Sequence, residues 1–339
     1  MIRYILITGV VLFFSACGNT SQQKQTETTE SVSTAQPQSA ADAKFPFPEI
    51  PTMLTQPEER KAYLMAHYWD NFNFADTALV NNRNVAEQGA ADYLAILVDG
   101  TLTEEQVKGS LDGFCKGMEA QEHARKVFLQ MMEDYLYNPN SPFHNEGLYA
   151  LFLERMLKSE FVDEARKSSL KFSLDLISRN CPGKLATDFV YFLPDGSRHS
   201  LAQTRAKNNR LLLVFYDPEC PSCHETMQEM VADGMLAEAV KAGKLTVLAV
   251  YTEGNQEVWK RTLSDLPQGW TVGSDHETVK QGALYDLKAM PSLYLLDGTK
   301  RVLLKDAPYA KIREEIAALS ESGQPVDSSC QCTDHAFHL

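Results

Sequence analysis

The chain has 339 residues, which at about 150 residues per domain predicts two domains. Apolar residues make up 44% and charged residues 23%, so the chain can bury a full core, and neither wholesale disorder nor a collagen-like chain is expected. Lys and Arg total 32 against 45 Asp and Glu, and the formal charge of −13 repels phosphate backbones, so no nucleic-acid partner is expected. After residue 16, no uninterrupted apolar run reaches the about 20 residues that cross a bilayer.

Residues 1–16 read as a secretory signal peptide. Arg3 supplies a positive charge, residues 4–14 are almost wholly apolar, and the small residues Ser15 and Ala16 precede Cys17. A cysteine at this place resembles the lipobox of bacterial lipoproteins, which implies cleavage before Cys17 and lipid on its thiol and amine. The alternative is a plain cleaved signal with a chance cysteine.

Residues 17–44 are expected to form a lipidated, flexible tether. They are rich in Ser, Thr, Gln and Ala and contain no large apolar residue, so burial cannot repay the entropy of ordering them. The expected location is therefore the cell envelope, where the lipid anchor would hold the folded part at a membrane, facing the periplasm.

Residues 45–180 are predicted to form an all-α helical bundle domain, because apolar residues recur there at three- and four-residue steps. Thr103 and Gln106 match a capping box at the start of the longest predicted helix. Cys115 lies on the apolar face of that helix, where a cysteine behaves as a small apolar residue. No ligand constellation stands out, so the role of this domain stays open. The predicted helices are 58–72, 84–97, 103–137, 146–158 and 163–179.

Residues 181–322 show a different pattern, in which short, continuously apolar strands alternate with helices. Such strands are typical of a sheet that is covered on both faces, which predicts an α/β domain with a central mixed sheet flanked by helices. The predicted strands are 189–193, 198–201, 211–216, 245–251, 270–272, 292–296 and 301–304, and the predicted helices are 219–241, 255–263, 278–287 and 309–320.

The motif Cys220-Pro-Ser-Cys223 stands where the strand 211–216 passes into the next helix. The N–H groups and the dipole at a helix N-terminus stabilise a thiolate, so Cys220 is predicted to be the nucleophile. Cys223, three residues on, is placed to attack a mixed disulfide that Cys220 forms. A structural disulfide and half of a zinc site are the alternatives.

The neighbours of the two cysteines are expected to adjust their reactivity. Pro221 has no N–H to satisfy and fits the first helical turn. Glu219 is an adjacent carboxylate, which raises a thiol pKa and moderates the activation of Cys220. Histidine side chains ordinarily titrate near neutrality, so His224 is predicted to tune the thiols as well.

This segment resembles thioredoxin-fold proteins, specifically the exported TlpA/ResA-like thiol-disulfide oxidoreductases. The resemblance covers about residues 182–321 and rests on 211–223, on Asp188-Phe189 with the turn at 194–196, and on Met290-Pro291 with the apolar strand after it. It implies a thioredoxin-like fold in which a cis-proline, Pro291, packs against the cysteine pair. Met290, Pro221 and Ser222 are expected to contact a bound substrate peptide.

Two positions depart from the family pattern. Val214 stands where thioredoxin has a buried acid on the strand before the motif, and Thr226 stands where the ResA-like group has a glutamate, although Glu225 and Glu229 are near. How Cys223 loses its proton is therefore not given by the resemblance.

The expected function is a membrane-tethered periplasmic thiol-disulfide oxidoreductase that reduces disulfides in envelope proteins and needs no organic cofactor. Its partners would be disulfide-containing envelope proteins, the membrane and, for a reductant, a membrane electron-donor protein. One alternative is an envelope lipoprotein that binds partners and uses the thioredoxin fold as a platform. Another is a c-type haem protein, because Cys220-Pro-Ser-Cys-His224 also matches the C-x-x-C-H attachment motif.

Residues 323–339 form a tail that contains cysteine and histidine. Cys330, Cys332, His335 and His338 are candidates for a zinc or copper site. A local disulfide, a second redox pair that exchanges with Cys220 and Cys223, or a bond to Cys181 are the other readings, and an oxidising envelope favours a disulfide. Without Cys17 six cysteines remain, and their pairing does not follow from the count.

Overall fold

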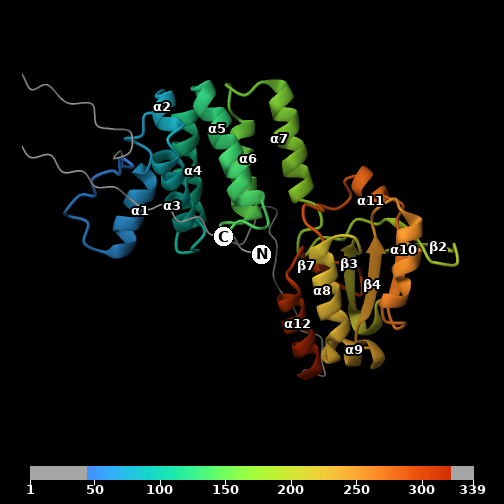
Figure 1. The fold of residues 1–339 in the computed structure, drawn as a ribbon. Helices are drawn as coiled ribbons and strands as arrows, with labels where there is room; N and C mark the ends of the chain where they lie inside the picture. The colour runs from blue at the N-terminus through green and yellow to red at the C-terminus, as the bar shows by residue number, and fades with distance from the viewer. Residues whose placement is uncertain (1–43, 322–339) are drawn as a thin grey trace, which may run out of the picture. The chain divides into compact units, whose positions relative to one another are not determined.

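The structure, a computed structural model, describes residues 44–321, which comprise a helical region followed by a mixed sheet with flanking helices (Figure 1). This architecture confirms the predicted fold class. No helix among the described residues is both long enough and apolar enough to cross a membrane. The signal segment, most of the tether with Cys17, and the tail residues Cys330, Cys332, His335 and His338 lie outside the described residues.

The helical region is built around one continuous apolar core. The indole ring of Trp69 packs against the rings of Phe72, Phe114 and Phe128. Cys115 is fully buried in the same core, and burial raises the pKa of its thiol to about 12, so it acts as the small apolar residue that the sequence predicted. The helices are α1 Pro57–His67, α2 Thr77–Val80, α3 Gln88–Leu97, α4 Glu104–Glu119, α5 Glu122–Met132, α6 Glu146–Leu157 and α7 Glu164–Ile177, with π-helical turns at η1 Arg83–Glu87 and η2 Glu133–Tyr137.

The prediction of one helix over 103–137 is wrong. Its start is as expected, because Thr103 caps α4 by accepting the N–H of Gln106, whose side chain in turn accepts the N–H of Thr103. The chain leaves the helix at Gln121, which is extended, and resumes as α5. Helix α4 packs against α1, α5 and α6, and α6 packs against α7 (Figure 1).

A seven-stranded sheet forms the second part, in the order β2-β1-β5-β4-β3-β6-β7. Strand β3 is buried along its whole length and pairs in parallel with β4 and antiparallel with β6. At one edge, the backbone of residues 183–186 lies along β7 and the residues before it, exchanging N–H and carbonyl hydrogen bonds with Lys300 and Val302. The strands are β1 Val190–Phe192, β2 Arg198–Ser200, β3 Arg210–Tyr216, β4 Thr246–Tyr251, β5 Thr271–Ser274, β6 Ser292–Asp297 and β7 Val302–Leu304.

Helices α8, α9, α10 and α12 contribute to the apolar core on one face of this sheet, where α8 and α10 lie over β3 and β4 in Figure 1. The prediction of one helix over 219–241 is wrong, because Asp233 is extended and caps a new helix by accepting the N–H of Met235. The prediction of a helix over 278–287 is also too long, because only the single turn α11 is helical. The elements are α8 Pro221–Ala232, α9 Gly234–Lys241, α10 Gln256–Thr262, α11 Thr278–Gln281 and α12 Tyr309–Glu321, with 3-10 turns at η3 Lys207–Asn209 and η4 Leu263–Asp265.

A glycine in β5 allows β1 to approach closely, and its replacement should destabilise the sheet. A Cβ atom on Gly273 would lie 2.5 Å from the Tyr191 ring and 3.2 Å from the Phe192 carbonyl oxygen. We expect Gly273→Ala to lower the free energy of unfolding by about 1–3 kcal/mol, as overpacking does, measured by urea denaturation. The control is Gly109→Ala in α4, where nothing lies within 4 Å and alanine should stabilise by up to about 1 kcal/mol. Equal stability of Gly273→Ala and the unmodified protein would contradict the prediction.

Candidate active site

The two cysteines of the motif lie at the junction between β3 and α8. Cys220 is the N-cap of α8, with an extended backbone, and Pro221 occupies the first helical position. Cys223 therefore lies in the first helical turn, as predicted. The turn that connects strand and helix is closed by a hydrogen bond from the Cys220 N–H to the Asp217 carbonyl at 3.2 Å.

Cys220 is a free, half-buried thiol whose surroundings favour the thiolate. Its sulfur lies 3.1 Å from the Ser222 hydroxyl oxygen. Hydrogen bonding by that hydroxyl is the largest influence on the Cys220 pKa and lowers it, and N–H groups of the first turn act in the same direction. This arrangement supplies a nucleophile on the accessible side of the pair.

Cys223 has the opposite environment. Its side chain is fully buried beside Tyr216 and Met227, and burial raises the pKa of its thiol to about 12. The Asp217 N–H donates to the Cys223 sulfur at 3.4 Å and partly offsets this effect. Cys223 therefore stays protonated at neutral pH while Cys220 reacts.

The expected cis peptide bond is present between Met290 and Pro291. It ends a stretch of ten residues, 282–291, that joins α11 to β6 and that we call the cis-proline loop. The Met290 carbonyl oxygen accepts a hydrogen bond from the Ser222 hydroxyl at 2.8 Å and lies 3.9 Å from the Cys220 sulfur. The structure thus brings Met290, Ser222 and Cys220 together, and the substrate contacts assigned to Met290, Pro221 and Ser222 stay predictions.

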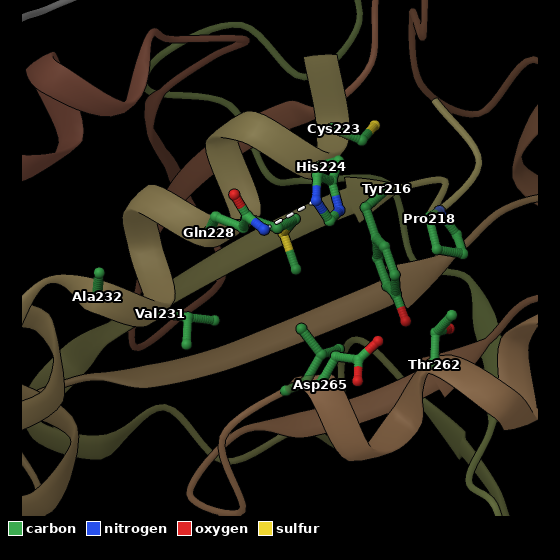
Figure 2. A pocket seen from close by; sticks show the side chains of 11 residues that line it. Tyr216, Pro218, Cys223, His224, Gln228, Val231, Ala232, Thr262 and Asp265 are labelled. Carbon is green, nitrogen blue, oxygen red and sulfur yellow. Dashed lines mark hydrogen bonds between the residues drawn. The ribbon is translucent and has the colours of Figure 1, made fainter. Parts of the chain in front are cut away.

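Glu219 and His224 lie next to the cysteines but are exposed. The His224 ring is turned toward Gln228, one turn further along α8, and the two side chains hydrogen bond at 2.8 Å (Figure 2). The influences on the Cys220 pKa come from Ser222, Cys223 and burial, so redox tuning by Glu219 and His224 stays a prediction. The effect of Ser222 on the pKa of Cys220 was missed in the sequence analysis. The signal was present, because Ser222 is the second residue of a helix whose N-cap is Cys220.

A cavity of 280 Å³ lies behind Cys223, between α8 and the segment that runs from α10 into η4 (Figure 2). Tyr216, Met227, Val231 and Leu266 give it a largely apolar lining. The Cys223 sulfur is buried against the Asp217 N–H. A haem attached through the C-x-x-C-H motif stays an alternative prediction.

Among residues 44–321, no three His, Cys, Asp or Glu side chains are grouped as metal ligands would be. The metal candidates of the tail lie beyond this range.

Comparisons with known proteins show the family of the chain. Residues 197–309 match the family model of a thioredoxin-like domain, and residues 16–180 match a domain of unknown function, DUF5106. The crystal structure of a thioredoxin-like protein from Bacteroides caccae is 35% identical, with a TM-score of 0.71, and the match covers 81% of this chain and 99% of that one. The chain therefore belongs to the thioredoxin-like proteins, with an N-terminal DUF5106 domain.

Other solved structures match a smaller share of the chain. The C-terminal domain of an uncharacterized protein from Bacteroides fragilis is 37% identical and covers 41% of this chain and 98% of its own, with a TM-score of 0.39. A thiol-disulfide oxidoreductase from Bacteroides fragilis is 24% identical and covers 39% and 99%, with a TM-score of 0.33. No curated protein matches the chain.

Proposed function

We propose that the protein is a thiol-disulfide oxidoreductase of the cell envelope that reduces disulfides in other envelope proteins. The observation that carries this proposal is the pair of thiols at one helix N-terminus whose pKa values are shifted in opposite directions, lowered for Cys220 and raised to about 12 for Cys223. Such a division between a reactive and a protected thiol is what two-step disulfide exchange requires.

The chemistry would proceed in two exchanges. The Cys220 thiolate attacks one sulfur of a client disulfide, which forms a mixed disulfide and releases the other client sulfur as a thiolate. Cys223 gives up its proton and attacks the Cys220 sulfur, which releases the second client thiol and leaves a Cys220–Cys223 disulfide. Two electrons thus pass from the protein dithiol to the client.

The donors around Cys220 favour the reducing direction. They are one neutral hydroxyl, from Ser222, and backbone or thiol groups, without a cationic side chain among them. A strong oxidant owes its high reduction potential to strong stabilisation of its reduced form, and we infer that this uncharged set of donors corresponds to a lower potential. We propose accordingly that a membrane electron-donor protein regenerates the dithiol and that lipid on Cys17 holds the protein at the membrane.

The test is to trap the first intermediate. In Cys223→Ser the mixed disulfide with Cys220 cannot be resolved, so envelope proteins should accumulate as adducts that separate from the protein on adding dithiothreitol. The matched control is the double variant Cys220→Ser, Cys223→Ser, which lacks the attacking sulfur. The proposal fails if Cys223→Ser yields no more adducts than the double variant.

A further inference from the structure

The cis-proline loop contains no helix or strand of its own, and side chains of the helical region contact it. The Tyr137 hydroxyl donates to the Asp286 carboxylate at 2.7 Å. The Asn180 amide donates to the Leu284 carbonyl at 2.9 Å, and Arg179 donates to the carbonyl of the preceding residue, Ala283. The helical region therefore fixes both the backbone and the side chains of this loop.

A nearly buried group of charges, which we call the Lys288 cluster, also joins the helical region to this loop. Glu146, at the first position of α6, accepts hydrogen bonds from Lys288 and, at 2.7 Å, from Lys305. The Lys288 and Lys305 side chains are only 6% and 5% exposed. Removing one partner from such a group leaves an unpaired buried charge, which is strongly unfavourable. The cluster comprises Glu146, Asp286, Lys288, Lys305 and Asp306.

The Lys288 cluster reaches both sides of the Met290–Pro291 bond. Lys288 stands two residues before Met290 and lies 3.4 Å from the Asp306 carboxylate. Asp306 in turn accepts the hydroxyl of Ser292, the residue after Pro291, at 2.7 Å. Contacts that begin at Glu146 in the helical region therefore hold the chain on both sides of Met290 and Pro291.

The Met290 carbonyl competes with Cys220 for a single proton. Ser222 has one hydroxyl hydrogen, and its oxygen lies 2.8 Å from the Met290 carbonyl oxygen and 3.1 Å from the Cys220 sulfur. While the hydroxyl donates to Met290, it cannot donate fully to the Cys220 thiolate. Moving the carbonyl away would free the hydroxyl for the thiolate.

We propose that Glu146 and Tyr137 are positioning residues of the redox site, which hold the Met290 carbonyl where it accepts the Ser222 hydroxyl. The helical domain would then set the reactivity of Cys220, a role in addition to any partner that it binds. This inference rests on the proposed function, because it assigns a role to the reactivity of Cys220. The contacts that carry it do not depend on which client is reduced.

The experiment measures the rate of Cys220 alkylation by iodoacetamide against pH in the reduced full chain, with mass spectrometry to identify the modified cysteine. We expect Glu146→Gln to shift the profile to lower pH by about half a unit, which is roughly threefold more thiolate below the midpoint. The control is Glu119→Gln, which removes a carboxylate of similar exposure, 13% against 19%, from its pair with Arg155 inside the helical region. It should not shift the profile.

The Ser222→Ala variant tests whether Glu146 acts on Cys220 through the Ser222 hydroxyl. Because alanine has no hydroxyl to redirect, Glu146→Gln should no longer shift the profile there. Tyr137→Phe removes only the hydroxyl bound to Asp286 and serves as the second variant if Glu146→Gln fails to fold. The titratable neighbours of Cys220, which are Asp217, Glu219, Cys223 and His224, remain in every variant.

The inference is overturned if the profiles of Glu146→Gln and Tyr137→Phe coincide with that of the unmodified protein, or if the shift persists in Ser222→Ala. Alkylation requires no client protein. If no clients are trapped but the alkylation profile shifts, the proposed function fails and the coupling between Glu146 and Cys220 stands. If clients are trapped but the profile does not shift, the coupling fails and the proposed function stands.

Discussion

Replacing Cys220 by serine should abolish reduction of a model disulfide, with a loss of at least about a thousandfold in turnover, because a hydroxyl at this position is not ionised at neutral pH and cannot form a mixed disulfide. Serine differs from cysteine only in its oxygen atom, so the N-terminus of α8 should persist. The measurement is turnover of glutathione disulfide or insulin with a chemical reductant as electron source.

Cys115→Ala is the matched control for this loss. Cys115 is fully buried in the helical core, with a pKa raised to about 12, so its removal should leave turnover unchanged. Residual turnover in Cys220→Ser close to that of the unmodified protein would contradict the assignment of the nucleophile. Partner capture that survives in Cys220→Ser would favour the alternative of a binding lipoprotein.

The two cysteines of the motif should differ widely in their rates of alkylation at pH 7. The pKa of Cys220 is lowered below 9 and that of Cys223 is raised to about 12, so their thiolate populations differ by about a thousandfold or more. A thiolate of higher pKa is intrinsically more nucleophilic, so each Cys223 thiolate should react about thirtyfold faster than a Cys220 thiolate, which offsets part of the difference in population. We therefore expect Cys220 to react at least about thirtyfold faster, and burial of Cys223 increases the ratio.

The dependence on pH has a definite sign. The Cys220 rate should rise with pH and level off once the pH passes its pKa, whereas the Cys223 rate should still be rising as the pH approaches 12. Peptide mapping of the reduced protein after timed exposure to iodoacetamide gives both rates in one sample. Comparable labelling of the two cysteines at pH 7 would show that the thiols are not divided into a reactive and a protected member.

The strands and the position of the motif could be predicted because their signals are local. Residues 211–216 are continuously apolar, and the strand that contains them, β3, is buried on both faces. The helix boundaries were harder. No glycine or proline marks the helix break at Gln121. Asp233-Gly234 is a turn signal, but the helical spacing of apolar residues on both sides of it favoured one continuous helix.

The contacts of the cis-proline loop had no local signal at all. Glu146 and Lys288 are 142 residues apart, and each reads alone as an ordinary charged surface residue. Only the fold brings them together and buries them. The same holds for the proximity of Ser222 to Met290, which depends on β6 pairing with β3 so that residue 292 lies beside Phe215.

The borders of the sheet bear on how the protein behaves at high concentration. The outermost strands, β2 and β7, have three residues each, and residues 183–186 already occupy backbone hydrogen-bonding groups beside β7. A long row of unpaired N–H and carbonyl groups is what lets one molecule extend the sheet of another. Because so little of that row is exposed in residues 44–321, the sheet offers two copies hardly any edge for aggregation.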